Sequence, residues 1–265
     1  MRPAWATGSQ GSFENFEKFC IANLSLTKKT VGCHRAYYNY VSRFVKPELA
    51  SMRDIQEIIV RRKQEGKSIH NLIKFIRVFY GKFLGLEWAK SFKVPQPIIQ
   101  VKTIPTRKQL KTFFENLPSD KARTVFLLLA SSGLRLSEAL NARIDLENKM
   151  IIPNSHQGET KKSYVSFFNG EAEEWLLKTG AVRVSRFRVE KWFKQTSDKT
   201  GIRITAKTLR EWFCSEMARL GIPDRYVDAF CGRVPRSVLA KHYSDYSIDR
   251  LKEIYEKANL RILED

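Results

Sequence analysis

The sequence predicts a mainly α-helical protein, with an N-terminal helical bundle and a second, mostly helical domain that contains a small antiparallel β-sheet. Three observations predict this fold class. Apolar residues recur at helical spacing through most of the 265 residues. Two short β-like runs interrupt that spacing at residues 149–153 and 163–168. Two prolines within residues 92–99 separate the first hundred residues from the rest.

Short helices are predicted throughout the first hundred residues. Ser12, Thr27 and Ser68 each precede apolar residues at helical spacing, and the side-chain oxygen of such a residue accepts a free N–H group at a helix N-terminus. Another helix carries the apolar residues of 55–60 and ends near Gly66. Four short helices with basic faces indicate a compact bundle.

Pro95 and Pro97 break the helical pattern after this bundle. A proline lacks the backbone N–H that a helix uses, and it disfavours helical backbone in the residue before it. We therefore predict a helical domain over residues 1–95, a linker over residues 96–104 and a second domain over residues 105–265.

The second domain is predicted to be helical on both sides of its sheet. Thr106 and Ser119 open two helices, and the second of these contains the apolar run 125–130. The two β-like runs follow, joined by a polar turn over residues 154–162, as is typical of a β-hairpin. Helical spacing resumes at Gly170 and continues almost to the end of the chain.

The chain is strongly basic, with 47 Lys and Arg against 28 Asp and Glu, a net charge of +19 and a pI of about 9.9. Hydrophobic residues make up 43% of it, which excludes an intrinsically disordered polycation and suffices for one or two cores. Lysine and arginine that neutralise phosphates release condensed counterions, so nucleic acid is the leading partner. A membrane surface is the weaker candidate, because the sequence contains neither a lipidation motif nor a separate basic amphipathic helix.

Other sequence features argue against membrane, secreted and metal-binding classes. The longest apolar run, residues 125–130, is far shorter than the roughly 20 residues that cross a bilayer. The first dozen residues lack the apolar centre of a signal peptide. The four cysteines show no CxxC spacing and the four histidines are dispersed, so we expect reduced thiols and no metal site. A soluble cytoplasmic protein without a metal or other cofactor is expected.

The segment 131–140 places an arginine between two helices. An apolar helix ends at Gly133, Arg135 follows almost at once, and Ser137 is positioned to cap the next helix. An arginine at such a junction commonly pairs only with nearby carboxylates or carbonyls. This segment alone therefore indicates no function.

Four residues downstream of Arg135, three basic and one aromatic, occur in a characteristic order. A lysine and an arginine lie three apart at the start of a helix, a second arginine follows a glycine, and a tyrosine comes ten residues later. They are Lys207, Arg210, Arg233 and Tyr243. Together with Gly133-Leu134-Arg135 and a lysine of the predicted hairpin, this set resembles the tyrosine recombinase (phage integrase) family over roughly residues 103–255.

The resemblance implies a site-specific DNA recombinase or integrase of a mobile genetic element, most similar to integrases of archaeal spindle-shaped viruses and related plasmids. Such an enzyme integrates a viral genome by cleaving and rejoining DNA through a 3′-phosphotyrosine intermediate, without metal or nucleotide. The resemblance also implies that the N-terminal bundle is the family's SAM-like core-binding domain. The two domains would then clamp double-stranded DNA attachment sites, with monomers or dimers in free solution and a homotetramer on DNA.

The roles that the resemblance implies suit the residue types. Two guanidiniums, those of Arg135 and Arg210, would bind the charge that gathers on the phosphate oxygens in the transition state. Tyr243 would attack phosphorus. A hairpin lysine would protonate the leaving 5′-oxygen; the family's Lys-x-x-x-Val spacing selects Lys161, and a slip of one residue would select Lys162.

Two positions depart from the family pattern. The family usually has His where this chain has Lys207, and His or Trp where it has Arg233. Both side chains are too basic to accept a proton at neutral pH, so we assign them to phosphate binding. The proton acceptor for the tyrosine stays unassigned, because His242 is its neighbour in sequence and adjacent residues of a helix point apart.

Other tyrosines compete for the role of nucleophile. Spacing from the Gly-Arg pair selects Tyr243 and leaves Tyr246 as the main alternative, while Tyr226 and Tyr255 are expected to be core or surface aromatics. A last helix is predicted from about residue 247 to residue 260. Its apolar face would pack either within its own chain or on a neighbouring protomer.

A second group of basic residues is predicted to contact the DNA backbone without reading its sequence. They are Lys28, Lys29, Arg61, Arg62, Lys63, Arg186 and Arg188. The sequence leaves two alternatives to a recombinase. One is a type IB topoisomerase-like enzyme that only relaxes DNA, and the other is a DNA-binding protein of the same fold with little or no catalytic activity.

Overall fold

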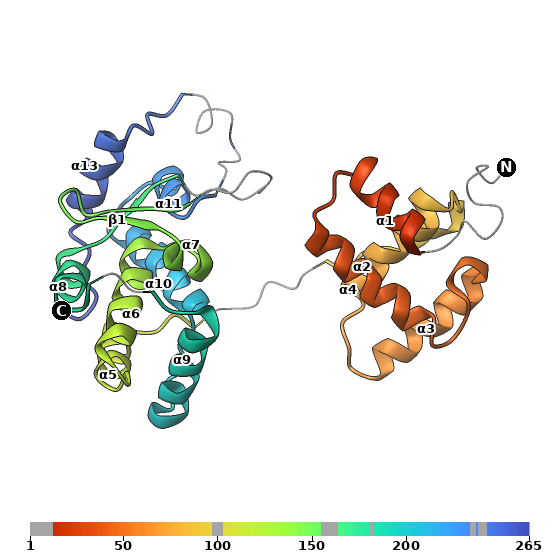
Figure 1. Cartoon of the computed structure of the whole chain (residues 1–265), viewed down its shortest axis with the longest axis horizontal. Helices are drawn as coiled ribbons and strands as arrows, with labels where there is room; N and C mark the ends of the chain where they lie inside the picture. Colours follow the sequence, from red (N-terminus) through yellow and green to blue (C-terminus); the bar gives the residue numbers. More distant parts are fainter. Residues whose placement is uncertain are drawn as a thin grey trace. The chain divides into compact units, whose positions relative to one another are not determined.

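The computed structural model describes residues 13–96, 103–154, 164–180, 183–233, 237 and 243–264. The chain divides into two compact units, residues 1–100 and 101–265 (Figure 1). Helices dominate both units, and the second also contains a three-stranded antiparallel sheet. The predicted fold class, mainly helical with one small sheet, is confirmed.

The first unit is built from short helical segments. They are α1 (Phe13–Ala22), α2 (Lys28–Val41), η2 (Pro47–Leu49), α3 (Met52–Gln64), α4 (His70–Ile76), η3 (Arg77–Phe83) and η4 (Glu87–Ser91). Thr27 caps α2 as predicted, since its side chain accepts the N–H of Thr30. The helix expected after Ser68 is instead two segments, because α4 continues into the π-helical turn η3. Ser12 lies outside the described residues.

Aromatic side chains fill the core of the first unit. The ring of Phe16 on α1 packs against Phe75 of α4 and against Phe79 and Phe83 of η3, with ring centroids 5.0 to 6.1 Å apart. All four residues are essentially inaccessible to solvent. Large rings in edge-to-face contact bury much apolar area per residue, which lets short helices form a stable unit.

The second unit combines longer helices with the sheet. Its elements are α5 (Arg107–Glu115), α6 (Asp120–Ser132), α7 (Leu136–Leu140), β1 (Arg143–Asp145), β2 (Met150–Ile152), β3 (Ser166–Phe167), α8 (Gly170–Thr179), α9 (Arg186–Thr200), α10 (Ala206–Arg219), α11 (Asp224–Phe230) and α13 (Ile248–Ala258). The apolar helix α6 lies at the centre and packs against α8 and α10. Its residues 124–132 are all buried, as the predicted apolar run requires. Ser119 caps its first turn by accepting the N–H of Ala122.

The strands pair in the order β1-β2-β3, with both pairs antiparallel. Ile151 at the centre of β2 lies opposite Ile144 on one side and Ser166 on the other. The predicted runs correspond to β2 and β3, whereas β1 was not predicted, because its three residues contain a single apolar side chain between two charged ones. The predicted turn over residues 154–162 lies almost entirely outside the described residues, which do not include 155–163.

Helix α13 packs onto its own unit. Leu251, Ile254 and Ala258 are buried in the same core as α6, and the hydroxyl of Tyr255 donates to the carbonyl of Ser131 at 2.8 Å. Of the two partners considered for this apolar face, the structure shows the intrachain one. Within the part of the chain that the structure describes, no helix is long and apolar enough to cross a bilayer.

Candidate active site

The candidate site begins where α6 ends. Gly133 has a left-handed backbone with φ of +64°, and its N–H donates to the carbonyl of Leu129. A Cβ at this position would overlap the ring of Phe213 on α10. Glycine therefore satisfies two requirements here, the positive φ of a helix C-cap and the close approach of an aromatic ring.

Arg135 is the N-cap residue of α7 and is held by that helix, whereas Ser137, the predicted cap, is the second residue of α7. Glu138 accepts the backbone N–H of Arg135 at 2.9 Å and its guanidinium Nη1 at 2.6 Å. The arginine side chain is 33% exposed and the glutamate 15% exposed. Glu138 thus fixes both the backbone and the guanidinium of Arg135, while a third of the arginine side chain remains open to a ligand.

Arg210, on α10, is the most deeply placed cation of the site and is only 9% exposed. Its Nη1 donates to the carbonyl of Gly133 at 2.8 Å and its Nη2 to the carbonyl of Cys231 at 2.7 Å. The two terminal nitrogens of one planar guanidinium thus donate hydrogen bonds to two buried carbonyl groups. Arg210 therefore joins the end of α6 to the end of α11.

Arg233 lies two residues beyond that second carbonyl. Its backbone N–H donates to the carbonyl of Asp228 at 2.8 Å, and its Nη1 lies 3.3 Å from the Asp228 carboxylate. Its side chain is 45% exposed. The structure therefore brings Arg135, Arg210 and Arg233 together, because Arg210 bonds to residues two positions before each of the others.

The electrostatics of this cluster follow from burial and from the mutual repulsion of the cations. Burial lowers the pKa of Arg210, and the charges of Arg135 and Arg233 lower it further, against the opposing effect of the thiols of Cys231 and Cys214. Burial also lowers the pKa of Arg233, but the two thiols and Asp228 outweigh it, so that this pKa is raised. Both groups stay charged, and a bound phosphate would relieve the repulsion among the cations.

Lys207 occupies the first turn of α10, three residues before Arg210. Residues three apart share a helix face, so the lysine lies on the side of α10 that carries Arg210. Its side chain is 81% exposed and its Nζ lies 3.7 Å from the carboxylate of Glu211. An exposed amine held by one long ion pair is available to a phosphate.

The candidate nucleophiles differ in accessibility. Tyr243 is 77% exposed, whereas Tyr226 is 7% and Tyr255 is 5% exposed. Tyr246 is half-buried, and its ring packs edge-on against Tyr226 with centroids 6.1 Å apart. Burial raises the pKa of the Tyr255 hydroxyl, so this residue has the features of a core aromatic. Lys161, Lys162 and His242 lie outside the described residues.

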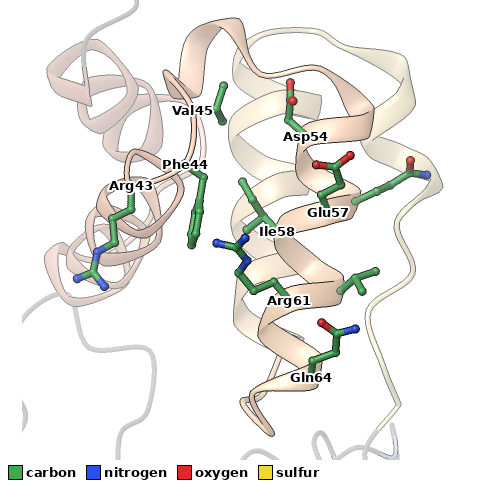
Figure 2. Close-up of a pocket in the computed structure, with 10 residues that line it drawn as sticks. Arg43, Phe44, Val45, Asp54, Glu57, Ile58, Arg61 and Gln64 are labelled. Carbon is green, nitrogen blue, oxygen red and sulfur yellow. The ribbon is translucent and has the colours of Figure 1, made fainter.

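Two of the arginines predicted to contact DNA are engaged with aromatic rings of the first unit. The guanidinium of Arg62 lies 4.8 Å from the ring centroid of Tyr40 and 5.4 Å from that of Tyr37, and its Nε donates to the carbonyl of Ser68. Arg61 lies 5.0 Å from the ring centroid of Phe44, across a groove of about 640 Å³ (Figure 2).

The same groove is lined by two carboxylates, Asp54 and Glu57, as Figure 2 shows. Glu57 lies one helical turn before Arg61 on α3, so its carboxylate weakens the attraction of Arg61 for phosphate. The other basic residues of this group are exposed; they are Lys28, Lys29, Lys63, Arg186 and Arg188. Among the residues that the structure describes, Arg186 alone of these five has an ion-pair partner, the carboxylate of Glu190 at 2.7 Å.

Sequence reasoning gave no role to three groups that shape the site. Glu138 holds Arg135, and the thiols of Cys214 and Cys231 lie 3.4 Å apart beside the arginines. The glutamate had a signal in the sequence, since a carboxylate three residues into a helix commonly accepts the N-cap N–H. The cysteines had none, because they are 17 residues apart on different helices.

Solved structures share this fold. The chain matches a lambda integrase dimer bound to a COC′ core site with a TM-score of 0.68 and 12% identity, over 94% of this chain and 100% of that one. It matches the Tn1549 transposon integrase in complex with transposon right end DNA with a TM-score of 0.65 and 14% identity, over 92% and 98%. The fold is therefore that of the integrases.

Sequence comparison identifies the family. The profile described as archaeal phage integrase matches residues 102–259, more than half of the chain. The chain belongs to the archaeal phage integrase family. It is 25% identical to the tyrosine recombinase XerA of Thermococcus onnurineus over 89% of this chain and 93% of that protein, and 26% identical to XerA of Pyrococcus horikoshii over 89% and 91%.

Proposed function

We propose that this protein is a tyrosine-type site-specific DNA recombinase that cleaves and rejoins double-stranded DNA through a 3′-phosphotyrosine intermediate. The observation that carries the proposal is the cluster of Arg135, Arg210 and Arg233, built from three separate segments and tied together by two buried carbonyls. An exposed Tyr243 follows in the same unit. Relatives of 25–26% identity over most of the chain are named as tyrosine recombinases, which supports the same activity here.

The arginines stabilise the charge of the reaction. Attack on a phosphodiester gathers negative charge on the two non-bridging oxygens, and guanidiniums aimed at that charge lower the barrier most when they are already in position. Arg210 is held by Gly133 and Cys231 before any substrate binds. Arg135 and Arg233 keep 33% and 45% of their side-chain surface open and are the groups that reach the phosphate. Lys207 supplies a further charge at the rim.

The covalent step conserves the energy of the broken bond. The hydroxyl of Tyr243 loses its proton to water, its oxygen forms a bond to phosphorus, and the bond from phosphorus to the 5′-oxygen breaks. A proton passes to the departing 5′-oxygen from the hairpin lysine, Lys161 by the family spacing. Attack by the 5′-hydroxyl of another strand reverses the step, so that strands are exchanged without a nucleotide or an external energy source.

The partner of this chemistry is duplex DNA. The net charge of +19 suits a surface that neutralises many phosphates. Exchange between two duplexes requires four strand transfers, so we propose a homotetramer on DNA. The lambda integrase has been solved as a tetramer bound to a Holliday junction, and it shares this fold with a TM-score of 0.66.

The test uses a pool of nicked duplexes of randomised sequence. When a recombinase cleaves close to a nick, the short 5′-hydroxyl fragment diffuses away and the protein stays bound to the DNA through its tyrosine. The expected result is a covalent protein–DNA adduct on a denaturing gel, whose DNA can be sequenced to identify the site. Absence of any adduct contradicts the proposal. Two plasmids that carry the recovered site then separate strand exchange, which we expect, from simple relaxation of supercoils, which would indicate a topoisomerase.

A further inference from the structure

We propose that Cys214 and Cys231 form a redox modification site, which a peroxide converts to a disulfide, and that this disulfide slows DNA cleavage at the adjacent arginine cluster. The two sulfur atoms lie 3.4 Å apart in the reduced protein. Cys214 lies on α10, one turn after Arg210, and Cys231 caps the C-terminus of α11. The pair therefore links the middle of α10, which carries Arg210, to the end of α11, which precedes Arg233.

The geometry permits a bond between the two sulfurs. A disulfide has a sulfur–sulfur distance of about 2.05 Å, so closure requires the atoms to approach by roughly 1.4 Å, which is the scale of a side-chain rotation with a small backbone shift. Cys214 is half-buried and accessible to a small oxidant, whereas Cys231 is fully buried behind it. These positions suit an attacking thiol and a resolving thiol.

The surroundings of Cys214 favour its reactive, ionised form. A hydrogen bond from the Cys231 thiol lowers the pKa of Cys214, burial raises it, and the nearby guanidiniums of Arg233 and Arg210 lower it again, with a net lowering. The pKa of Cys231 is raised, because it donates that hydrogen bond and is buried. A thiolate is the nucleophile in thiol oxidation, so one member of the pair is activated and the other keeps its proton.

The oxidation balances with hydrogen peroxide as the oxidant. The Cys214 thiolate attacks one peroxide oxygen, the O–O bond breaks, and Cys214 sulfenic acid and hydroxide form. The Cys231 sulfur then attacks the sulfur of the sulfenic acid, its proton leaves with the displaced hydroxyl as water, and the disulfide results. Two sulfurs are oxidised, and the two oxygens of peroxide are reduced to hydroxide and water.

The disulfide acts on the site in two ways. It removes the negative charge of the ionised Cys214 sulfur. That charge lies beside Arg233 and Arg210 in the reduced protein and partly offsets the repulsion between the two arginines. It also pulls on Cys231, whose carbonyl accepts Arg210 at 2.7 Å and which lies two residues before Arg233. A displacement of catalytic groups by about 1 Å can cost on the order of 100-fold in rate. We expect oxidation to slow formation of the covalent DNA adduct by about 10- to 100-fold on this basis.

The experiment uses the full chain with Cys33→Ser, which removes the exposed thiol that could form unrelated disulfides. Dilute hydrogen peroxide is added, and peptide mapping by mass spectrometry identifies the modified cysteines. Adduct formation on the nicked duplex pool is measured before oxidation, after oxidation and after reduction with dithiothreitol. The matched control, Cys214→Ser in the same background, keeps a small polar side chain but cannot form the bond.

A Cys214–Cys231 disulfide, a slower reaction and recovery on reduction, with no peroxide effect in the Cys214→Ser control, support the inference. The inference is overturned if no such disulfide forms, if the oxidised protein reacts as fast as the reduced one, or if the control slows equally. The part that concerns cleavage rests on the proposed function, and the peptide map separates the two failures. A protein that forms the disulfide but gives no DNA adduct in any state contradicts the recombinase proposal. The peptide map alone then shows whether Cys214 and Cys231 are a redox modification site.

Discussion

Arg210 and Tyr243 belong to the same candidate site, yet the side chain of Arg210 is buried and that of Tyr243 is exposed. Arg210 is 9% exposed and bonds to two backbone carbonyls, whereas Tyr243 is 77% exposed. The deepest cation of the site is thus part of the core of the second unit, and the candidate nucleophile is not. Changes at the buried Arg210 should therefore affect stability and activity together, while changes at the tyrosine should affect activity alone.

The largest effect is expected at the tyrosine. Tyr243→Phe should abolish the covalent adduct, a loss of at least about 1000-fold, because phenylalanine lacks the hydroxyl that forms the phosphotyrosine bond. The thermal midpoint of unfolding should not change, since the side chain is exposed. Adduct formation on nicked duplexes and thermal unfolding measure the two effects. Tyr246→Phe is the matched control and should keep its adduct; the reverse pattern would move the nucleophile to Tyr246.

Arg210→Lys should lower both activity and stability. A lysine cannot span the carbonyls of Gly133 and Cys231, so one buried acceptor loses its donor, at a cost of about 1 to 3 kcal/mol in unfolding free energy. Cleavage should slow by about 100-fold, because the ends of α6 and α11 that position Arg135 and Arg233 would no longer be held together. Urea unfolding and the rate of adduct formation measure these changes.

Arg233→Lys is the comparison for that variant, because its side chain is 45% exposed. It should slow cleavage while its unfolding free energy stays within about 0.5 kcal/mol of wild type. Equal destabilisation by the two substitutions would refute the distinction between a buried and an open cation.

Gly133→Ala tests the junction that carries Arg135. The new Cβ would overlap the ring of Phe213 and would sit on a residue with φ of +64°. We expect a loss of about 2 to 4 kcal/mol in unfolding free energy, from backbone strain and overpacking together. Gly66→Ala is the matched control, since its φ is +68° but nothing lies within 4 Å of its Cβ; it should lose only the backbone term, about 1 to 2 kcal/mol. Equal losses would show that the Phe213 contact is unimportant.

A smaller, pH-dependent effect is expected from the first unit. His34 is 7% exposed between the rings of Phe16 and Phe75, and burial lowers its pKa below 6.5. The unfolded chain then binds a proton at a higher pH than the folded chain does, so stability falls as the pH drops below about 6.5. Urea unfolding at a series of pH values measures the slope. His34→Leu should flatten the slope below about pH 6.5, and an unchanged slope would exclude His34 as the cause.

Local sequence patterns correctly predict several helix boundaries of this protein. Thr27 and Ser119 cap the helices that they were expected to cap, and Gly133 ends α6. These features depend on a few neighbouring residues. Strand β1 was missed because three residues with one apolar side chain give no alternation, and its pairing with β2 is what makes it a strand.

The candidate site likewise has features that local sequence patterns predict and contacts that they do not predict. The order Gly-Leu-Arg, Lys-x-x-Arg and Gly-Arg points to the cluster, but the contacts that hold it join residues far apart in sequence. Arg210 and Gly133 are 77 positions apart, and Cys214 and Cys231 lie on different helices. Arg62 looks like a free cation in sequence and is packed on Tyr37 and Tyr40 in the fold. Only tertiary structure reveals these contacts.

The central claim, that the arginines neutralise charge on one phosphate, has a direct test. Once the adduct has located the scissile phosphate, one of its non-bridging oxygens is replaced by a methyl group, and cleavage by wild type and Arg233→Ala is compared on both DNAs. If Arg233 acts through charge, its removal should cost about 100-fold on the phosphate and several-fold or less on the uncharged methylphosphonate. An equal loss on both DNAs would contradict the account.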